Sequence, residues 1–393
     1  MSVSTLAEQQ QAYMVAIRRD LHARPELSEQ EAQTGARVMA ELTALGIPFV
    51  RVGDYGVVAT IEGTGTDRAV ALRADMDALP VQEENTHLPY MSKHDGVMHA
   101  CGHDGHTAML LGAARVLKER RDEIRGVVKL CFQQAEETGR GVPEILAELK
   151  KYPVECCFGI HLWSGFETGK ISVEAGPRMA AGQRVTIVVT GQGTHGAYPH
   201  KGIDPILAAS SIVMNLAALM SREVDPIYPS VLTFGAISGG TAGNVVPEHV
   251  TLSGSLRTTN KDQQASLIKA ITRVAQDTAQ SWRATARVDI PPGVSVVIND
   301  PHCSQIARGA ALKIVGAGDV APFHTLMASE NFGDFLDVYP GVFAFIGVHN
   351  KACGATWPHH HPKFNIDEDQ LWKGAALHAQ FAIDYLQSPP QRA

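Results

Sequence analysis

Apolar and polar positions follow two different patterns along this chain. Short, mostly apolar runs typical of strands buried on both faces occur at residues 56–61, 69–73, 127–132, 156–160 and 342–348. Apolar residues recur at helical spacing over residues 4–21, 28–46, 107–121, 299–316 and 367–386. Ser28 and Glu31 have the spacing of a capping box at the start of the second helix. This order predicts an α/β domain in which a mixed sheet lies between layers of helices.

The pattern changes at residue 183. Strands are predicted at 184–190, 231–238, 250–257 and 284–290, and helices at 205–220 and 262–282. The order βαββαβ predicts a smaller, ferredoxin-like α+β domain. We therefore expect a discontinuous first domain, residues 1–182 and 298–393, with residues 183–297 inserted into it.

Composition narrows the classes of partner. The chain has 393 residues, 45% of them apolar, and a net charge of -7, which gives no basic face for nucleic acid and no polybasic membrane patch. No apolar run is expected to span a membrane, and the first thirty residues do not read as a secretory signal. Six cysteines without framework spacing read as free thiols. A cytoplasmic protein with a small-molecule partner is expected.

The densest chemistry lies between His99 and Thr107, where a thiol and imidazoles precede the helix at 107–121. Cys101 and His103 are two positions apart, and both thiolate and imidazole bind zinc and its neighbours. A zinc finger would need a Cys-x-x-Cys partner that this stretch lacks. Further ligands must come from other parts of the chain.

The other candidates each follow a predicted buried strand. They are Asp75 and Asp77, the pair Glu136 and Glu137, His161, and the triplet 359–361. In open α/β sheets, sites form where strands end, so these side chains are expected to converge. Two adjacent carboxylates point in different directions, so that one can bind metal while the other faces a water molecule. The aspartates would orient the ligand histidines.

These residues, with several longer motifs, resemble a known family. The chain is similar to the hippurate hydrolase and indole-acetyl-amino-acid hydrolase branch of the dinuclear-metal amidohydrolases, relatives of aminoacylase and the carboxypeptidase G group. The resemblance covers nearly the whole chain and is carried by Arg19 to His22, Pro25 to Ser28, Arg73 to Pro80, His99 to Thr107, Ala135 to Glu137, Gly159 to His161, Gly193 to His200, Asn244 to Pro247, Arg257, and His360 to Phe364.

The resemblance implies a role for each matching residue. The implied metal ligands are Cys101, His103, Glu137, His161 and His360, with the thiolate bridging two divalent ions, zinc or manganese, or else cobalt or nickel. Which histidine of the triplet is the ligand stays open. Glu136 is implied as general base. The inserted domain is implied to be a lid that pairs subunits into a homodimer or homotetramer and brings His195, Asn244 and Arg257 to the substrate.

The expected activity is hydrolysis of an N-acyl amino acid to a carboxylate and a free amino acid. An arginine ending an apolar strand fits a substrate with a free carboxylate, so Arg257 is expected to bind that group, with Asn244 nearby. The alternatives are a dipeptidase or carboxypeptidase, a cysteine hydrolase using Cys101, and a non-enzymatic metal or redox sensor. The sequence departs from the family pattern at two places: Thr194 stands where a glycine is more usual, and the loop after His161 lacks the expected prolines. Both places are expected on the substrate-binding side of the site.

Overall fold

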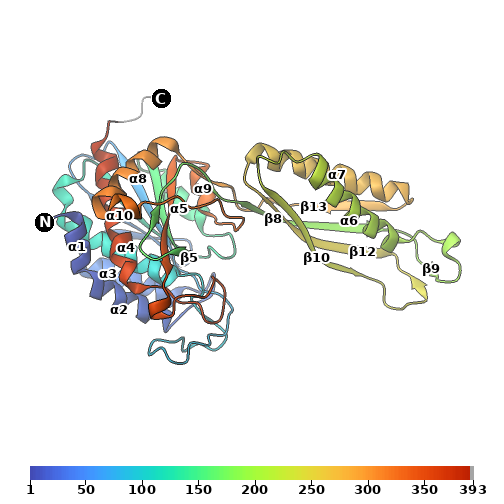
Figure 1. The fold of residues 1–393 in the computed structure, drawn as a ribbon, viewed down its shortest axis with the longest axis horizontal. Coiled ribbons are helices and arrows are strands. Elements are labelled where there is room, and N and C mark those ends of the chain that lie inside the picture. Colours follow the sequence, from blue (N-terminus) through green and yellow to red (C-terminus); the bar gives the residue numbers. More distant parts are fainter. Residues whose placement is uncertain (390–393) are drawn as a thin grey trace. The chain divides into compact units, whose positions relative to one another are not determined.

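A seven-stranded mixed sheet forms the centre of the first of two units in the computed structural model, which describes residues 1–389 (Figure 1). Unit 1 contains residues 1–176, 298–324 and those from 334 onward, and unit 2 contains residues 177–297 and 325–333. The sheet order is β1-β2-β4-β3-β5-β15-β6, and β4, β3, β5 and β15 run parallel. Its strands are β1 (Phe49–Val52), β2 (Gly56–Glu62), β3 (Ala69–Asp75), β4 (Val127–Gln133), β5 (Val154–Glu167), β6 (Ile171–Ser172) and β15 (Gly341–His349).

Helices cover this sheet and complete its core. The helices are α1 (Val3–Gln9), α2 (Gln11–His22), α3 (Ala32–Ala44), α4 (His103–Glu119), α5 (Val142–Leu149), α8 (Pro301–Ile314) and α10 (Leu371–Gln387), with the short α9 (Phe332–Leu336) where the two units join along the chain. Helices α4 and α10 pack on each other and on β3 and β5. Strand β3 is buried at every residue. The mixed sheet and its helical layers confirm the predicted fold class.

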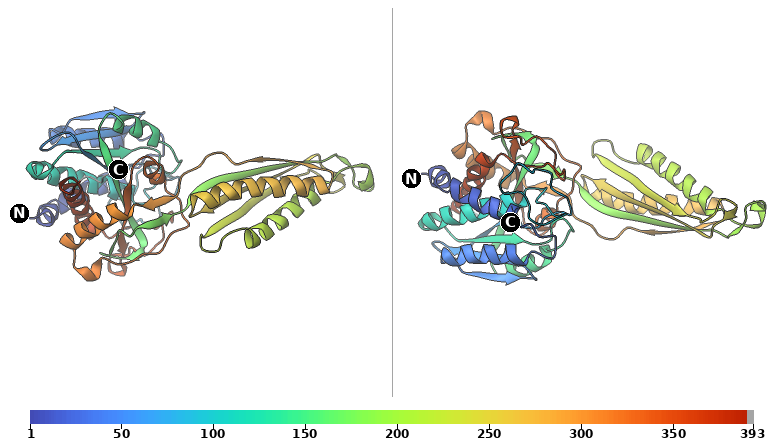
Figure 2. Two further views of the ribbon diagram at one scale, coloured as in Figure 1. Left: turned by 90° about the horizontal axis from the view of Figure 1, so that it is seen from above. Right: turned by 90° about the horizontal axis from the view of Figure 1, so that it is seen from below.

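Unit 2 has a four-stranded antiparallel sheet in the order β10-β12-β8-β13. Its elements follow the predicted order βαββαβ: β8 (Ala181–Thr190), α6 (Pro205–Arg222), β10 (Ser230–Gly239), β12 (His249–Thr258), α7 (Lys261–Ser281) and β13 (Thr285–Asp289). Helices α6 and α7 cover one face of the sheet (Figure 2). Six short strands were not predicted: β1 and β6 of the large sheet, and β7 (Gly176–Met179), β9 (Thr194–His195), β11 (Val245–Val246) and β14 (Val297–Asn299).

The boundaries of the units differ from the predicted ones. Residues 325–333, expected in the first domain, belong to unit 2, and so do residues 177–182. The backbone explains this, because Ala180 N donates to Leu326 O at 3.0 Å and to Ala328 O at 2.9 Å. A return segment distant in sequence thus pairs with the start of unit 2.

Local details correct two expectations. The first helix is two helices, α1 and α2, because the chain breaks at Gln10, and Ser2 caps α1 by accepting from Thr5 N. Helix α6 is long and apolar enough to cross a membrane by length and composition, contrary to expectation. Its residues Ala208, Ile212 and Leu216 are buried in the core of unit 2, whereas Leu207 and Met214 are exposed.

Ser28 and Glu31 do not form the predicted capping box. Helix α3 begins at Ala32, and the N–H groups of its first turn are bound by Glu26, which accepts from Gln33 N at 3.1 Å and from Thr34 N at 2.8 Å. Ser28 Oγ instead donates to Asp77 at 2.7 Å, and Glu31 Oε1 accepts from Ala135 N at 2.7 Å. Both side chains are therefore used for contacts with distant segments of unit 1.

Candidate metal centre

The candidate ligands of unit 1 come from the ends of neighbouring parallel strands and from one helix start. Asp75 ends β3, Glu136 and Glu137 follow β4, His161 lies within β5, and His360 lies in the loop after β15. Strands β4, β3, β5 and β15 are adjacent, so their carboxyl ends share one edge of the sheet. The sequence predicted that these side chains converge, and in the structure they lie along this one edge of the sheet.

Cys101 and His103 reach the same place from the start of α4. Gly102, at φ 91°, precedes the helix in a left-handed conformation that glycine adopts without strain. Burial, and next the charge of Glu137, raise the pKa of the Cys101 thiol well above its ordinary value. The helix start alone does not make this thiol an anion, so a thiolate here requires a cation beside it.

His103 presents one ring nitrogen to this space. Its Nδ1 lies 3.0 Å from Asp77 O and 3.2 Å from Asp77 Oδ1, and because both oxygens accept, Nδ1 carries a proton. Its Nε2 is buried and has no hydrogen-bond partner among the residues that the structure describes. Although burial opposes it, the charges of Asp75 and Cys101 raise the pKa of His103 well above its ordinary value. A buried, unpartnered Nε2 beside these acidic groups is suited to bind a metal cation.

His161 is oriented by the backbone of its own strand. Its Nδ1 donates to Leu162 O at 2.8 Å, which leaves Nε2 as the acceptor, 3.6 Å from Cys101 Sγ. Burial and the neighbouring His106 lower the pKa of His161 well below its ordinary value, so the ring is neutral. A neutral imidazole with a free Nε2 is the form that binds metal.

Glu137 and His360 complete a second set around the same thiol. Glu137 Oε1, buried without a hydrogen-bond partner, lies 3.8 Å from His103 Nε2 and 3.7 Å from His360 Nε2. Burial raises the pKa of Glu137 to about 7. Ligand atoms lie within 4.8 Å of one another in the set Cys101, His103 and His161, and likewise in the set Cys101, Glu137 and His360. Cys101 belongs to both sets, as a bridging thiolate would.

The three histidines of the triplet have different environments. His360 faces Glu137, whereas His359 Nε2 donates to Leu162 O at 3.0 Å and the His361 ring stacks on Trp357 at 4.2 Å. Burial lowers the pKa of His359 to about 3. Among the described residues of the triplet, His360 is the one grouped with other ligand atoms.

Glu136 lies beside these sets. One of its carboxylate oxygens is within 4.8 Å of ligand atoms of His103 and Glu137. The preceding residue, Ala135, has a φ of 58°, a conformation that is uncommon for alanine. Its N–H is held by Glu31, and Glu137 N donates to Asp77 Oδ2 at 2.9 Å. The loop that carries the two glutamates is thus fixed from both sides.

Several residues that orient this centre were missing from the sequence predictions. His106 Nδ1 donates to Asp75 Oδ1 at 2.6 Å, so Asp75 orients a histidine that is not a proposed ligand. Asp104, in the first turn of α4, forms an ion pair with Arg18 Nε at 2.8 Å and accepts from His22 Nδ1 at 2.7 Å, and all three side chains are fully buried. Arg18 and His22 lie in α2, a helix whose pattern otherwise indicates only packing against the core. Charged or titratable residues within such a helix are the sequence signal that could have indicated these contacts.

The lid residues lie at two ends of the unit 2 sheet. His195 pairs with Val245 across β9 and β11, and Gly196 N donates to Asn244 O at 2.7 Å. Arg257 lies near the other end of β12, eight residues beyond His249, or roughly 27 Å at the rise of a strand. Asn244 and Arg257 of the same chain are therefore far apart, contrary to the expectation that they lie near each other.

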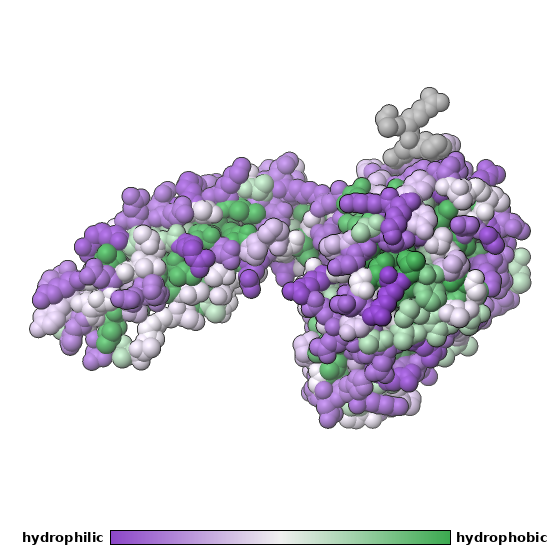
Figure 3. Space-filling view, turned by 180° about the vertical axis from the view of Figure 1, so that it is seen from behind, coloured by the Kyte–Doolittle hydropathy of each residue, from purple (hydrophilic) through white to green (hydrophobic). Residues whose placement is uncertain are grey.

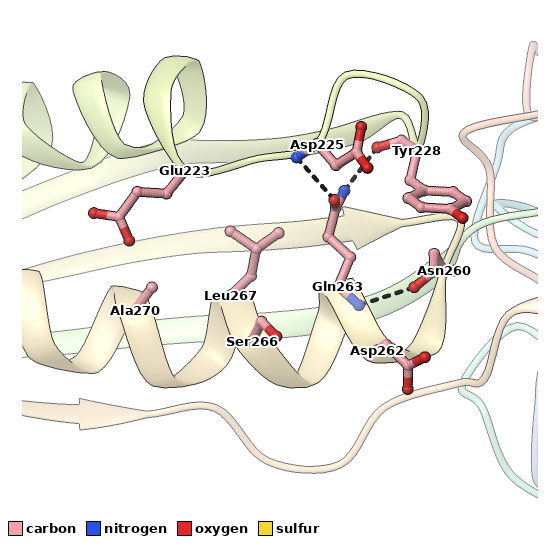
Figure 4. Close-up of a pocket in the computed structure, with 9 residues that line it drawn as sticks. All are labelled: Glu223, Asp225, Tyr228, Asn260, Asp262, Gln263, Ser266, Leu267 and Ala270. Atoms are coloured by element: carbon pink, nitrogen blue, oxygen red, sulfur yellow. Dashed lines mark hydrogen bonds between the residues drawn. The ribbon is translucent and has the colours of Figure 1, made fainter.

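A separate pocket in unit 2 contains none of the predicted site residues (Figure 4). Its polar groups bind one another, since Gln263 accepts from Asp225 N at 3.1 Å and donates to Tyr228 O at 2.7 Å. Asn260 accepts from Gln263 N at 2.9 Å as the cap of α7. These contacts join the ends of α6 and α7 and account for the polar residues there.

Comparison with known proteins gives matches along nearly the whole chain. The model described as Peptidase family M20/M25/M40 matches residues 71–384. IAA-amino acid hydrolase ILR1-like 4 of Arabidopsis thaliana is 39% identical over 379 residues, covering 95% of this chain and 86% of that protein. N-acetyl-L-cysteine deacetylase of Bacillus subtilis is 38% identical over 376 residues, covering 95% and 87%. The solved YXEP protein of Bacillus subtilis, a dinuclear metal binding peptidase, has a TM-score of 0.84 at 33% identity, covering 96% of this chain and 99% of its own.

Proposed function

The chain belongs to peptidase family M20/M25/M40, and from this membership and its donor sets we propose that it is a metal-dependent amidohydrolase of N-acyl amino acids. The observation that carries the proposal is the pair of donor sets sharing Cys101, with Glu136 alongside. Relatives named as an IAA-amino acid hydrolase and an N-acetylcysteine deacetylase support an N-acyl amino acid as substrate.

The donor chemistry fits two divalent ions. Thiolate, imidazole and carboxylate together suit zinc or manganese, with cobalt or nickel as further candidates. The unpartnered His103 Nε2 and Glu137 Oε1 are buried polar atoms that an ion would satisfy. When bound, such ions lower the pKa of a water molecule and polarise the scissile carbonyl.

The residues of the chain then divide the work of hydrolysis. The residues that would hold the ions are Cys101, His103, His161, Glu137 and His360. Glu136 accepts the proton of the attacking water and passes it to the leaving nitrogen. His195 of the lid donates to the oxyanion that forms on the carbonyl. Asp77 fixes the tautomer of His103 through the contacts described above, and Asp75 acts through His106.

Chelation and metal return test this function directly. The protein is dialysed against a chelator, assayed with hippurate, an indole-acetyl amino acid, an N-acetyl amino acid and a dipeptide, and assayed again after zinc or manganese is added. Loss and recovery of N-acyl amino acid hydrolysis is expected. Faster hydrolysis of the dipeptide would favour the peptidase alternative, and hydrolysis that persists without metal would favour a cysteine hydrolase. No hydrolysis of any substrate, with metal bound, would favour a sensor.

Arg257 is proposed to bind the substrate carboxylate. Its guanidinium donates to Ser329 Oγ, and the described residues include no carboxylate partner for it. Burial lowers the pKa of Arg257, because no anion offsets the loss of solvent. A partly buried guanidinium of this kind gains most from an anionic ligand that accepts two parallel hydrogen bonds.

The Arg257→Lys enzyme is expected to lose about 10- to 100-fold in kcat/KM on an N-acyl amino acid, because lysine cannot form the second of the two parallel hydrogen bonds to the carboxylate. The matched substrate is the corresponding N-acyl amino acid amide, which lacks the carboxylate and should be affected little. Steady-state kinetics on the two substrates measure the difference. Equal losses on both would assign Arg257 a structural role.

The separation of His195 and Arg257 within unit 2 supports pairing of subunits. A small substrate cannot contact both Arg257 and His195 within one copy of unit 2, because the length of β12 lies between them. If both residues contribute to one site, they come from different copies. Strand β10 is an edge of the sheet, and exposed apolar side chains lie on it and on the adjacent α6, including Ile237 and Met214, which are 55% and 71% exposed. Figure 3 shows apolar side chains among polar ones at the surface of the protein. Such an edge favours a homodimer or homotetramer.

The double variant Met214→Glu, Ile237→Lys is expected to be a monomer, because charges on this surface oppose its burial. Light scattering coupled to size exclusion measures the mass. Val338→Glu is the control, since Val338 is a similarly exposed apolar residue of unit 1. A double variant with the mass of the parental oligomer would place the interface elsewhere.

The cysteines support a cytoplasmic location. All six are free, and Cys156 Sγ lies 3.4 Å from Cys303 Sγ as a contact between thiols. A reducing compartment maintains this state.

A further inference from the structure

The backbone N–H and C=O of Leu162 connect three histidines around the candidate metal centre. Its carbonyl oxygen accepts from His161 Nδ1 at 2.8 Å and from His359 Nε2 at 3.0 Å. Its N–H donates to His106 Nε2 at 2.9 Å. Because a carbonyl oxygen only accepts, both His161 Nδ1 and His359 Nε2 carry protons. One backbone group therefore fixes two imidazole tautomers.

His359 is held on its remaining sides as well. Its Nδ1 lies 2.9 Å from Ser164 Oγ, so the ring is bonded to β5 at two points. The ring also stacks on Trp163, with centroids 4.3 Å apart and planes 28° from parallel. His359 thus ties the loop after β15 to the strand that carries His161.

The next residue, His360, has an unfavourable backbone conformation. Its φ is 65°, which is uncommon outside glycine and persists when surrounding contacts hold it. His360 N donates to Ala100 O at 2.8 Å, which ties the same loop to the segment leading to Cys101. Both of these anchors, His359 and the backbone bond to Ala100, lie on the N-terminal side of that torsion, and on its C-terminal side His361 N donates to Pro358 O at 3.3 Å.

We propose that His359 is a positioning residue that sets the geometry of both donor sets at once, one through His161 and the other through His360. The inference rests on the proposed metal centre but not on any substrate. His359 acts through Leu162 O and through its chain neighbour, and its own two nitrogens are occupied by hydrogen bonds. Without it, the loop loses its attachment to β5, and His360 is free to leave its left-handed conformation.

The test measures metal binding by the full chain, independently of hydrolysis. Metal-free protein is titrated with Co²⁺, and the visible absorption of the bound ion gives stoichiometry and affinity. His359→Phe keeps a ring against Trp163 but removes both hydrogen bonds. It is expected to bind Co²⁺ about 10- to 100-fold more weakly, the usual effect of losing a group that orients a ligand.

Two further variants make the result specific. His359→Gln retains an amide N–H that reaches Leu162 O, and it is expected to recover most of the affinity. His361→Phe changes the third histidine of the triplet, whose ring stacks on Trp357 and whose Nδ1 accepts from Lys363 N, and it is expected to bind Co²⁺ like the parental protein. Ser164→Ala, which removes only the partner of Nδ1, should weaken binding less than His359→Phe does. If His359→Phe does not fold, Ser164→Ala serves as the test instead. In that case, an affinity of Ser164→Ala for Co²⁺ equal to that of the parental protein would overturn the proposal.

The outcomes separate the inference from the proposed function. Native Co²⁺ affinity in His359→Phe overturns the positioning role. Equal weakening in His359→Phe and His359→Gln also overturns it, because a ligand histidine would behave in that way. A parental protein that binds no Co²⁺ overturns the metal centre itself and this inference with it. Parental binding of two ions without hydrolysis of any amide overturns the activity alone and leaves the positioning role supported by the variants.

Discussion

The Glu136→Gln enzyme is expected to keep its metal ions and to lose about 10²- to 10⁴-fold in kcat, the usual contribution of a general base. Glutamine has nearly the same shape as glutamate but does not accept a proton at neutral pH. Glu136 is grouped with His103 and Glu137, yet it belongs to neither of the two sets that share Cys101. Metal content and steady-state kinetics of the purified variant measure the two parts of this prediction.

Glu137→Gln is the matched control, one residue away on the same loop. Its Oε1 lies between His103 Nε2 and His360 Nε2, so this variant is expected to lose metal as well as turnover. The two substitutions remove the same charge from adjacent positions. If Glu136→Gln were depleted of metal while Glu137→Gln retained it, the proposed roles of the pair would be reversed.

Much of this centre could be predicted because its residues follow strands that read clearly in the sequence. The runs before Asp75, Glu136 and the triplet are buried in the structure as β3, β4 and β15. Parallel strands bring their carboxyl ends to one edge, so convergence follows from topology without knowledge of side-chain contacts. His161 differs only in lying inside β5, which continues to Glu167.

Contacts between distant segments were beyond the reach of local patterns. Ser28 and Glu31 have the spacing of a capping box, but a buried Asp77 and the N–H of Ala135 bind them instead. Local spacing cannot show which distant partner competes for a polar side chain. The same limit applies to Arg18, which binds Asp104 from another helix, and to residues 325–333, which return to unit 2.

Distance along a strand was the information missing for the lid. Asn244 and Arg257 are near each other in sequence, and both match family motifs. An extended strand between them, β12, separates them by more than the length of a small substrate. Sequence proximity is therefore a poor guide to a shared site when the intervening residues form a strand, and pairing of subunits becomes part of the functional proposal.

The second large effect is expected for Cys101→Ser. A serine hydroxyl is not an anion at neutral pH, and Cys101 is the residue shared by both donor sets, so its loss weakens both at once. The purified variant is expected to hold less than one ion per subunit after dialysis against a mild chelator, and its turnover should fall below detection. Metal analysis and the amidohydrolase assay give the two measurements.

Cys131→Ser and Cys303→Ser are suitable controls, because both thiols are fully buried and neither is grouped with a histidine or carboxylate that could share an ion. Burial raises the pKa of Cys131 to about 12, so this thiol stays protonated at neutral pH. Both controls are expected to retain the parental metal content even if the added polarity lowers their stability. Equal metal content in all three variants would exclude a bridging thiolate, and Glu137 would then be the first candidate for the shared ligand, because its Oε1 lies less than 4 Å from nitrogens of both His103 and His360.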